Sequence, residues 1–126
     1  FGTSLETILG YIFMPLAFLM GAPWSESNIL GSLLGQKIVL TELIAYMNLS
    51  TMEIGINGIS EKTAIIASYA LCGFANFSSV GILVAGVGAM SPERKNDLVS
   101  VSLKALIGAT LASCMTGLVI GLVNYL

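Results

Sequence analysis

An uncharged segment from Thr63 to Pro92 constrains the fold of this chain more than any other feature. It contains no aspartate, glutamate, lysine or arginine. As a helix rising about 1.5 Å per residue, it would exceed the roughly 30 Å hydrocarbon core of a bilayer. Its middle nevertheless holds residues that disfavour a helix interior or carry donors and acceptors that lipid cannot satisfy. These are Gly73, Asn76, Ser78 and Ser79. We predict a membrane-spanning helix that is divided there into two half helices.

The composition indicates a membrane protein rather than a soluble domain. Hydrophobic residues make up 56% of the chain and charged residues 10%, whereas soluble domains average about 45–50% and about 25%. Seven acidic and five basic residues give a net charge of -2, without the polybasic segment that indicates nucleic-acid binding. We expect the partner to be a small molecule or another membrane subunit, and no nucleic acid.

The sequence carries no pattern of an enzyme or a metal site. It has no histidine, which excludes a Ser-His-Asp or Cys-His arrangement within the chain, and it has no phosphate-binding loop. Cys72 and Cys114 lie in apolar surroundings, which argues against a disulfide framework or a transition-metal site. The chain begins at Phe1 without the basic flank and cleavage site of a secretory signal, and we interpret it as a fragment or a processed chain.

The first two of four predicted units are an interfacial helix and a re-entrant hairpin. In residues 1–22, apolar side chains follow helical spacing, but the stretch is short for a span and Pro15 is expected to kink or end it. Residues 25–57 start with the helix-initiating run Ser25–Asn28. Each half of this unit is shorter than the roughly 17 residues that a span requires. Two half-length helices that meet at a polar tip predict a re-entrant hairpin.

The other two units are a broken transmembrane helix in residues 60–91 and a last transmembrane helix in residues 96–126. Ser60 is expected to cap the start of the broken helix. The charge cluster Glu93–Asp97 connects the two units, and the positive-inside rule places it on the cytoplasmic side. The predicted fold class is therefore an all-α membrane protein with a re-entrant hairpin, a discontinuous helix and a continuous helix.

Small residues at intervals of four mark two helix faces that allow another backbone to come close. The first face lies in the hairpin and consists of Ser27, Gly31 and Gly35. The second lies in the last unit and consists of Ala105, Ala109, Ser113, Gly117 and Gly121. We expect both faces to pack tightly against neighbouring helices.

Glu42 is the most informative single residue, because an ionisable group at the hairpin tip is costly unless it is paired or functional. It could accept hydrogen bonds from substrate hydroxyls or couple to a cation or proton. It could equally form a structural ion pair with Lys37 or be exposed at an interface. Function is the preferred interpretation.

Four further residues are candidates for a binding site. Asn76 and Ser79 are three apart and would share a helix face, where an amide beside a hydroxyl suits recognition of a polyol such as a sugar. Hydrogen bonds between helices are the alternative for both residues. Phe74 could stack on a flat ligand or simply pack, and Gln36 could bind the ligand or tie the hairpin tip to its neighbour.

Three sequence motifs resemble the concentrative nucleoside transporter family. They are residues 35–37, 41–46 and 70–79, which read GQK, TELIAY and ALCGFANFSS. The third motif is long and specific, and the similarity extends over essentially the whole chain. It corresponds to the C-terminal half of such a transporter, with Thr41 at a position where the family usually has asparagine.

This resemblance implies one half of an inverted-repeat transporter that assembles as a homotrimer. It implies that Glu42, Asn76 and Ser79 hold the ribose of a nucleoside, with Phe74 near the ligand. Na+ or H+ is the expected coupling ion, and its ligands and the base-reading residues would lie in the missing N-terminal half. The expected function is cation-coupled nucleoside symport in a cell membrane, most simply a bacterial inner membrane.

Two alternatives remain open at the level of sequence. The chain could be a membrane subunit that serves assembly only, with its polar residues joining helices. It could also belong to an ion channel in which Glu42 lines the pore.

Overall fold

The computed structural model describes residues 5–55 and 58–124. Regular structure in this part of the chain is helical, apart from an isolated bridge between Ile54 and Ile59. The helices are α1 (Leu5–Leu19), α2 (Trp24–Val39), α3 (Glu42–Thr51), α4 (Glu61–Ala70), α5 (Phe77–Met90) and α6 (Lys95–Val123), with a 3-10 turn at Pro92–Arg94 before α6. The predicted all-α fold with a discontinuous helix is confirmed.

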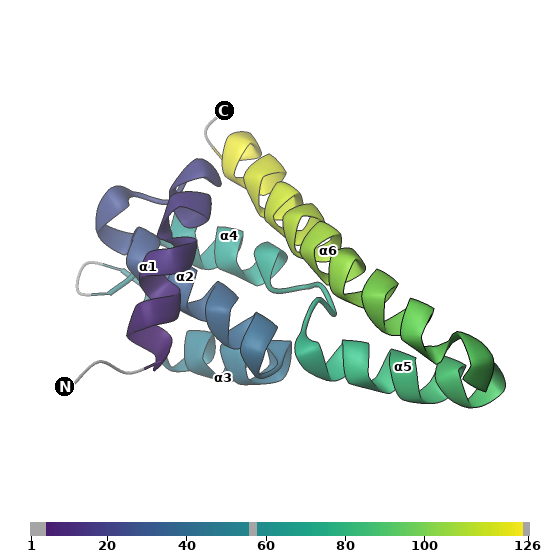
Figure 1. Cartoon of the computed structure of the whole chain (residues 1–126). Helices are drawn as coiled ribbons and strands as arrows, with labels where there is room; N and C mark the ends of the chain where they lie inside the picture. Colours follow the sequence, from purple (N-terminus) through teal and green to yellow (C-terminus); the bar gives the residue numbers. More distant parts are fainter. Residues whose placement is uncertain (1–4, 56–57, 125–126) are drawn as a thin grey trace.

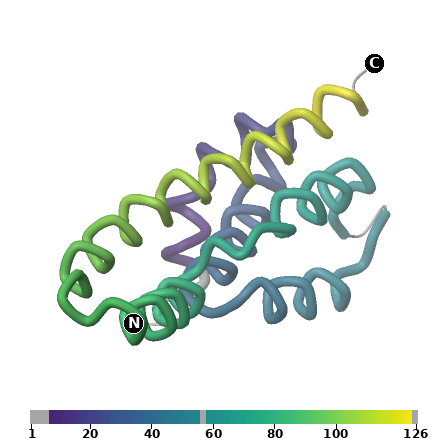
Figure 2. The backbone as a smooth tube through the Cα atoms, turned by 90° about the vertical axis from the view of Figure 1, so that its right-hand side faces the viewer, coloured from purple at the N-terminus to yellow at the C-terminus, as the bar shows by residue number. Residues whose placement is uncertain are grey.

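Helices α1 to α4 gather at one end of the molecule, and α6 runs back to them from its turn with α5 (Figure 1). Figure 2 shows α4 between α6 and α3, in agreement with the contacts that α4 makes with both. The buried apolar side chains come from α2 and α4 in particular, and include Leu30, Leu34, Ile66 and Leu71. The core therefore joins the α2–α3 pair to the first half of the discontinuous helix.

One helix in the described residues is long and apolar enough to cross a membrane. It comprises Pro92–Val123, and a second span is possible if α1 and α2, which are bent by 118° relative to each other, are counted as one. The bend lies at residues 21–23, where Gly21 has a positive φ of 97°. A side chain would be strained in that backbone conformation, which explains a glycine at this point.

The glycines of both predicted small-residue faces pack closely against other helices. A Cβ atom added to Gly31 would lie 2.6 Å from the Gly10 carbonyl oxygen, so α2 touches the backbone of α1. On α6, a Cβ at Gly121 would overlap the Met20 carbonyl oxygen, and one at Gly117 would lie 3.0 Å from the Ala70 Cβ. Tight packing is therefore confirmed at the glycines of both faces, whereas Ala105 and Ala109, at the other end of the α6 face, are exposed.

The first helices differ from expectation in two details: α1 does not end at Pro15, and α2 starts one residue before Ser25. Helix α1 continues through Pro15, which lies on its exposed side, so the ring does not disturb the contact with α2. Helix α2 begins at Trp24 with Pro23 before it and has no side-chain cap. Its Ser27 hydroxyl instead donates to the Pro23 carbonyl at 2.9 Å. The backbone bend at residues 21–23 thus sets the helix start, one residue earlier than the polar run indicates.

A carboxylate at the start of α2 is bound to the start of α4. Glu26 accepts hydrogen bonds from the Ser60 backbone N–H at 3.1 Å and from its hydroxyl at 2.8 Å. Ser60 in turn accepts from the Thr63 N–H at 3.2 Å and caps α4, as its position in the sequence predicts. Ser60 therefore stabilises both the helix end and the contact between two helices.

Replacing Ser60 by alanine is expected to lower the stability of the full-length protein by about 1–2 kcal/mol, because the cap and a partner of Glu26 are lost together. Thermal unfolding in detergent measures the change. Ser50→Ala is the matched control, since the exposed Ser50 hydroxyl donates only to a carbonyl of its own helix. Equal melting temperatures for the two variants would contradict the assigned role.

Candidate functional site

The candidate site forms where the starts of two helices meet. Glu42 is the first residue of α3, and Asn76 directly precedes α5 as its cap. The Asn76 amide nitrogen donates a hydrogen bond of 2.6 Å to the Glu42 carboxylate. Both groups lie at helix N-termini, whose partial positive charge favours a carboxylate such as Glu42. Residues far apart in the sequence thus form one polar pair.

Thr41 fixes the start of α3 at the hairpin tip. Its backbone is extended, and its hydroxyl accepts from the Ile44 N–H at 3.5 Å. The preceding helix α2 has ended at Val39, so the chain reverses within Leu40 and Thr41. This short connection places Glu42 in the first turn of α3, partly exposed.

Asn76 and Ser79 are brought together, but not on one face of a helix as expected. Asn76 Oδ1 accepts from the Ser79 N–H at 2.7 Å, and Ser79 Oγ accepts from the Asn76 N–H at 3.4 Å, which is a capping box. The expectation of a shared face is wrong because short polar side chains at a helix start bond the free backbone N–H groups. The Ser79 hydroxyl also lies 2.7 Å from the carbonyl oxygens of Phe74 and Asn76.

This arrangement leaves hydrogen-bonding capacity at the pair. An asparagine amide has two N–H groups, and the described hydrogen bonds of Asn76 Nδ2 use one of them, toward Glu42. A carboxylate has about four acceptor positions, and Glu42 uses one of them for Asn76. Asn76 is only 2% exposed, and its side chain is held in place as the cap of α5.

Phe74 lies in the connection between α4 and α5 and is 79% exposed. Together with Ser79 it lines a cavity of about 270 Å³ between α5 and α6, whose other walls include Leu83, Ser102 and Leu106. This volume is close to the lower limit for small-molecule sites. The ring is therefore available to a ligand beside the capping box.

Gln36 is not part of this group in the structure. It is buried in α2, where its side-chain oxygen accepts from Asn48 at 2.5 Å and its nitrogen donates to Ser32 at 3.3 Å. It lines a separate polar depression of about 470 Å³ with Ser32 and Asn48. Of the two alternatives for Gln36, these bonds match the tie between the helices of the hairpin.

Lys37 does not form an ion pair with Glu42, which was one of the alternatives for that residue. Its side chain is 1% exposed, and Nζ donates to the Ala70 carbonyl oxygen at 2.9 Å. Arg94 and Asp97 form an ion pair elsewhere in the described part of the chain. Sequence spacing could not reveal Ala70 as the partner of Lys37, because Ala70 offers only a backbone carbonyl.

Tyr46 is a further residue without an assignment from the sequence. Its hydroxyl donates to the Ser68 carbonyl oxygen at 2.5 Å and so ties α3 to α4. The sequence signal that could have identified Tyr46 is its place in the TELIAY motif. Among the described residues, the hairpin is thus bonded to the discontinuous helix at four points, through Glu26, Lys37, Glu42 and Tyr46.

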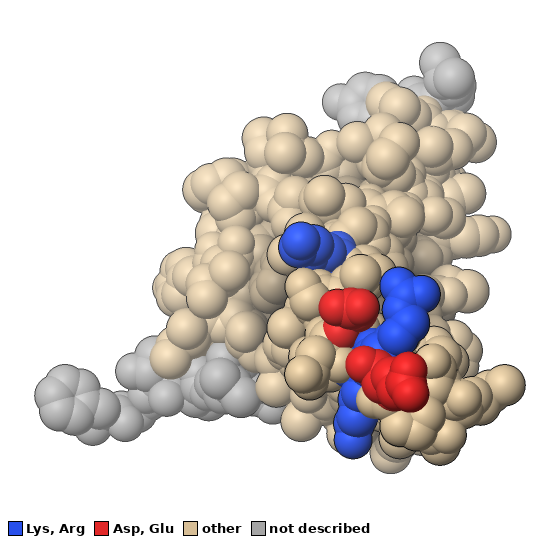
Figure 3. All heavy atoms as spheres, turned by 45° about the vertical axis from the view of Figure 1, so that its right-hand side comes forward, with Lys and Arg blue, Asp and Glu red and all other residues tan. Residues whose placement is uncertain are grey.

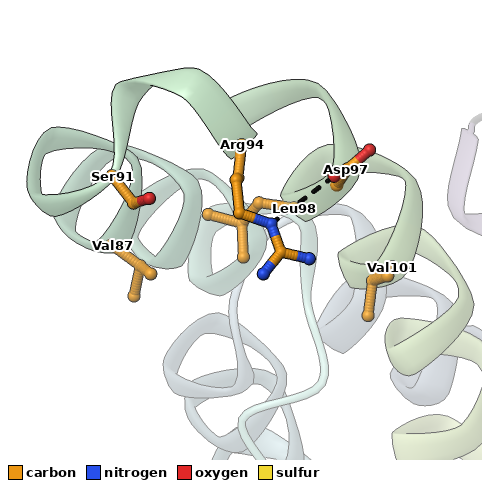
Figure 4. Close-up of a pocket in the computed structure, with 6 residues that line it drawn as sticks. All are labelled: Val87, Ser91, Arg94, Asp97, Leu98 and Val101. Atoms are coloured by element: carbon orange, nitrogen blue, oxygen red, sulfur yellow. Dashed lines mark ion pairs between the residues drawn. The ribbon is translucent and has the colours of Figure 1, made fainter.

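A second cavity of about 270 Å³ lies at the turn between α5 and α6 and is largely apolar. Figure 4 shows the Arg94 side chain between Val87 and Val101, with its ion pair to Asp97 at 3.6 Å. Both charged side chains are exposed, so the pair contributes little to stability. Basic and acidic groups are interleaved on this side of the molecule (Figure 3). The turn therefore has no strong field of one sign.

Comparison with known proteins gives consistent matches. Residues 1–121 match the family described as "Na+ dependent nucleoside transporter C-terminus". The chain is 46% identical to an uncharacterized transporter of Bacillus subtilis, YutK, over 96% of this chain and 29% of the relative. It is 44% identical to nucleoside permease NupC of Helicobacter pylori, over 94% of this chain and 29% of the relative. It is 41% identical to human solute carrier family 28 member 3, over 96% of this chain and 19% of the relative.

The structure is also similar to solved structures. It matches CNTnw in an inward-facing substrate-bound state with a TM-score of 0.86 and 41% identity, over 95% of this chain and 29% of that one. It matches a variant of CNTnw in an intermediate state with a TM-score of 0.87 and 40% identity, over 98% of this chain and 30% of that one. The chain thus spans less than a third of the length of these proteins.

Proposed function

This chain belongs to the family of Na+ dependent nucleoside transporters, whose C-terminal part it matches, and from this premise we propose that the full protein carries nucleosides across a membrane by cation symport. The family consists of transporters and not enzymes. In the proposal, this chain supplies the ribose-binding half of the site. The remaining part of the protein supplies the other half, including contacts to the base and the coupling cation.

The observation that carries the proposal is the hydrogen bond between Asn76 and Glu42 at the starts of α5 and α3. A ribose presents adjacent hydroxyl groups, each of which can donate one hydrogen bond and accept up to two. The Glu42 carboxylate accepts from such hydroxyls, and the second N–H of the Asn76 amide donates to them. A buried amide and a carboxylate held by helix caps are pre-organised for this recognition.

Two neighbours complete the proposed ribose site. The Ser79 hydroxyl donates to a backbone carbonyl and keeps the capacity to accept a hydrogen bond from the sugar. The exposed Phe74 ring offers an apolar face to the nucleoside. Gln36 has its place in the hairpin, where it holds α2 to α3 through Asn48.

The proposed mechanism is alternating access. Half helices that meet near the middle of the membrane bind substrate and ion in such transporters, and one part of the protein then moves against another. The bonds of Lys37, Tyr46 and Glu42 to the discontinuous helix keep the hairpin and this helix together during the movement. We further propose a homotrimer in a bacterial inner membrane, with Na+ or H+ as the coupling ion.

Uptake of labelled uridine into proteoliposomes that contain the full-length protein tests this function. An inward gradient of the coupling ion should raise uridine above its external concentration inside the vesicles. Separate Na+ and H+ gradients identify the ion, and dissipating the gradient with an ionophore should remove the accumulation. Uptake that is the same with and without either gradient would contradict symport, and the absence of uptake of uridine and of a labelled purine nucleoside alike would contradict nucleoside transport.

A further inference from the structure

Lys37 is an unusual residue because a charged side chain is fully buried. It is 1% exposed and is the largest of the fully buried side chains. Lysine is almost never fully buried unless its charge has a partner. Its partner is the Ala70 carbonyl oxygen, at 2.9 Å from Nζ. The Lys37 side chain therefore acts on the fold at Ala70.

Ala70 is the last residue of α4, so its carbonyl lies at the end of a half helix. The last four carbonyls of a helix have no partner within it and carry partial negative charge. A cation is the favourable partner for this end. In transporters with broken helices, such C-terminal ends coordinate the coupling cation. Here the cation is a lysine side chain from the hairpin.

The backbone that follows α4 passes close to the ammonium. A Cβ atom added to Gly73 would lie 3.4 Å from Lys37 Nζ and would overlap the Ser113 hydroxyl of α6. Three residues after Gly73, Asn76 caps α5 and bonds Glu42. Lys37 therefore contacts the start of the same break at whose end the candidate site lies.

The two charged residues of the hairpin are matched to the two ends of this break. Lys37 lies at the C-terminal end of α4, and Glu42 lies near the N-terminal end of α5. Each charge faces the helix end of opposite partial charge. Lys37 and Glu42 thus connect the hairpin to both ends of the break.

We propose that Lys37 is a positioning residue whose ammonium takes the place of a bound cation at the end of α4, and so holds Asn76 opposite Glu42. This inference rests on the proposed function for its consequence in nucleoside binding. It predicts that removal of the lysine side chain leaves a site that a monovalent cation or a small ammonium ion can enter.

The test compares Lys37→Met, Lys37→Arg and Lys37→Ala in the full-length protein, with Lys104→Met as the control on the exposed part of α6. Uridine affinity is measured by titration calorimetry, and thermal stability is measured without nucleoside. We expect Lys37→Met to bind about tenfold more weakly, within the range of typical coupling between two sites. Lys37→Arg should retain more affinity, and Lys104→Met should equal the unmodified protein.

Chemical rescue separates positive charge from packing. Added propylammonium should restore uridine affinity to Lys37→Ala, and it should have no effect on Lys37→Met, whose side chain fills the space. If Lys37→Ala unfolds during purification, propylammonium in the purification buffer should allow its recovery. The proposed role would be overturned if propylammonium restored neither the uridine affinity nor the recovery of Lys37→Ala. Equal affinities of Lys37→Met and Lys37→Arg for uridine would overturn it too.

Failure of this inference can be distinguished from failure of the proposed function. If the unmodified protein and Lys104→Met do not bind uridine, the proposed function fails, and the melting temperatures still report whether Lys37 holds the break. If both bind uridine and Lys37→Met binds it equally well, only the role of Lys37 is overturned.

Discussion

Replacing Glu42 by glutamine is expected to weaken uridine binding to the full-length protein by about 10- to 100-fold. A hydrogen bond to a charged group contributes about 1.5–3 kcal/mol, and glutamine keeps the size of the side chain while it loses this charge. In the unmodified protein the Asn76 amide donates to the Glu42 carboxylate. The N–H groups of a glutamine side chain cannot accept this hydrogen bond. Titration calorimetry in detergent measures the affinity directly.

Glu93→Gln is the matched control, because Glu93 is exposed in the turn before α6. It removes one negative charge at a distance from the pair and should leave uridine affinity unchanged. A loss of uridine affinity in both variants would show that the net charge of the protein controls binding, and not a contact made by Glu42. Unchanged affinity in Glu42→Gln, combined with lower stability, would instead favour the assembly role in which Glu42 and Asn76 only join helices.

Replacing Gly31 by alanine is expected to destabilise the protein by about 1–3 kcal/mol, the usual cost of overpacking. The added Cβ would lie 2.6 Å from the Gly10 carbonyl oxygen and 2.9 Å from the Met14 nitrogen. Both are backbone atoms, so no side chain can move aside, and α1 must shift as a whole. Thermal unfolding of the full-length protein in detergent measures this change.

Gly108→Ala provides the control in another helix, because no atom of the described chain lies within 4 Å of a Cβ at Gly108. Alanine favours a helix interior over glycine by up to about 1 kcal/mol, so this variant should be as stable as the unmodified protein or more so. If Gly31→Ala showed the same increase, the close contact between α1 and α2 would not exist in the full protein.

The interruption of the discontinuous helix could be predicted from sequence because it depends on local preferences. Glycine, asparagine and serine disfavour a helix interior, and α4 ends at Ala70 while α5 begins at Phe77. The close-packed faces could be predicted for the same reason, since the spacing of Gly31 and Gly35 on one helix face is a property of the chain alone.

The partners of the polar side chains could not be predicted from sequence. The sequence allows Lys37 to pair with Glu42, the nearest acid, but Lys37 bonds the backbone carbonyl of Ala70, which no side-chain pattern reveals. Asn76 and Ser79 were placed on a helix face, but the helix starts between them, and a shift of this start converts a shared face into a capping box. Both errors arise because tertiary contacts and helix ends decide which groups are free to bond.

The most direct test of the ribose site is a cycle of two proteins and two ligands. Affinities of uridine and 2′,3′-dideoxyuridine are measured for the unmodified full-length protein and for Glu42→Gln. If Glu42 binds the ribose hydroxyls, loss of the hydroxyls should weaken binding strongly in the unmodified protein and little in Glu42→Gln, with a coupling energy of about 1–3 kcal/mol. Equal losses in the two proteins would show that Glu42 does not contact these hydroxyls, and would contradict the proposed site.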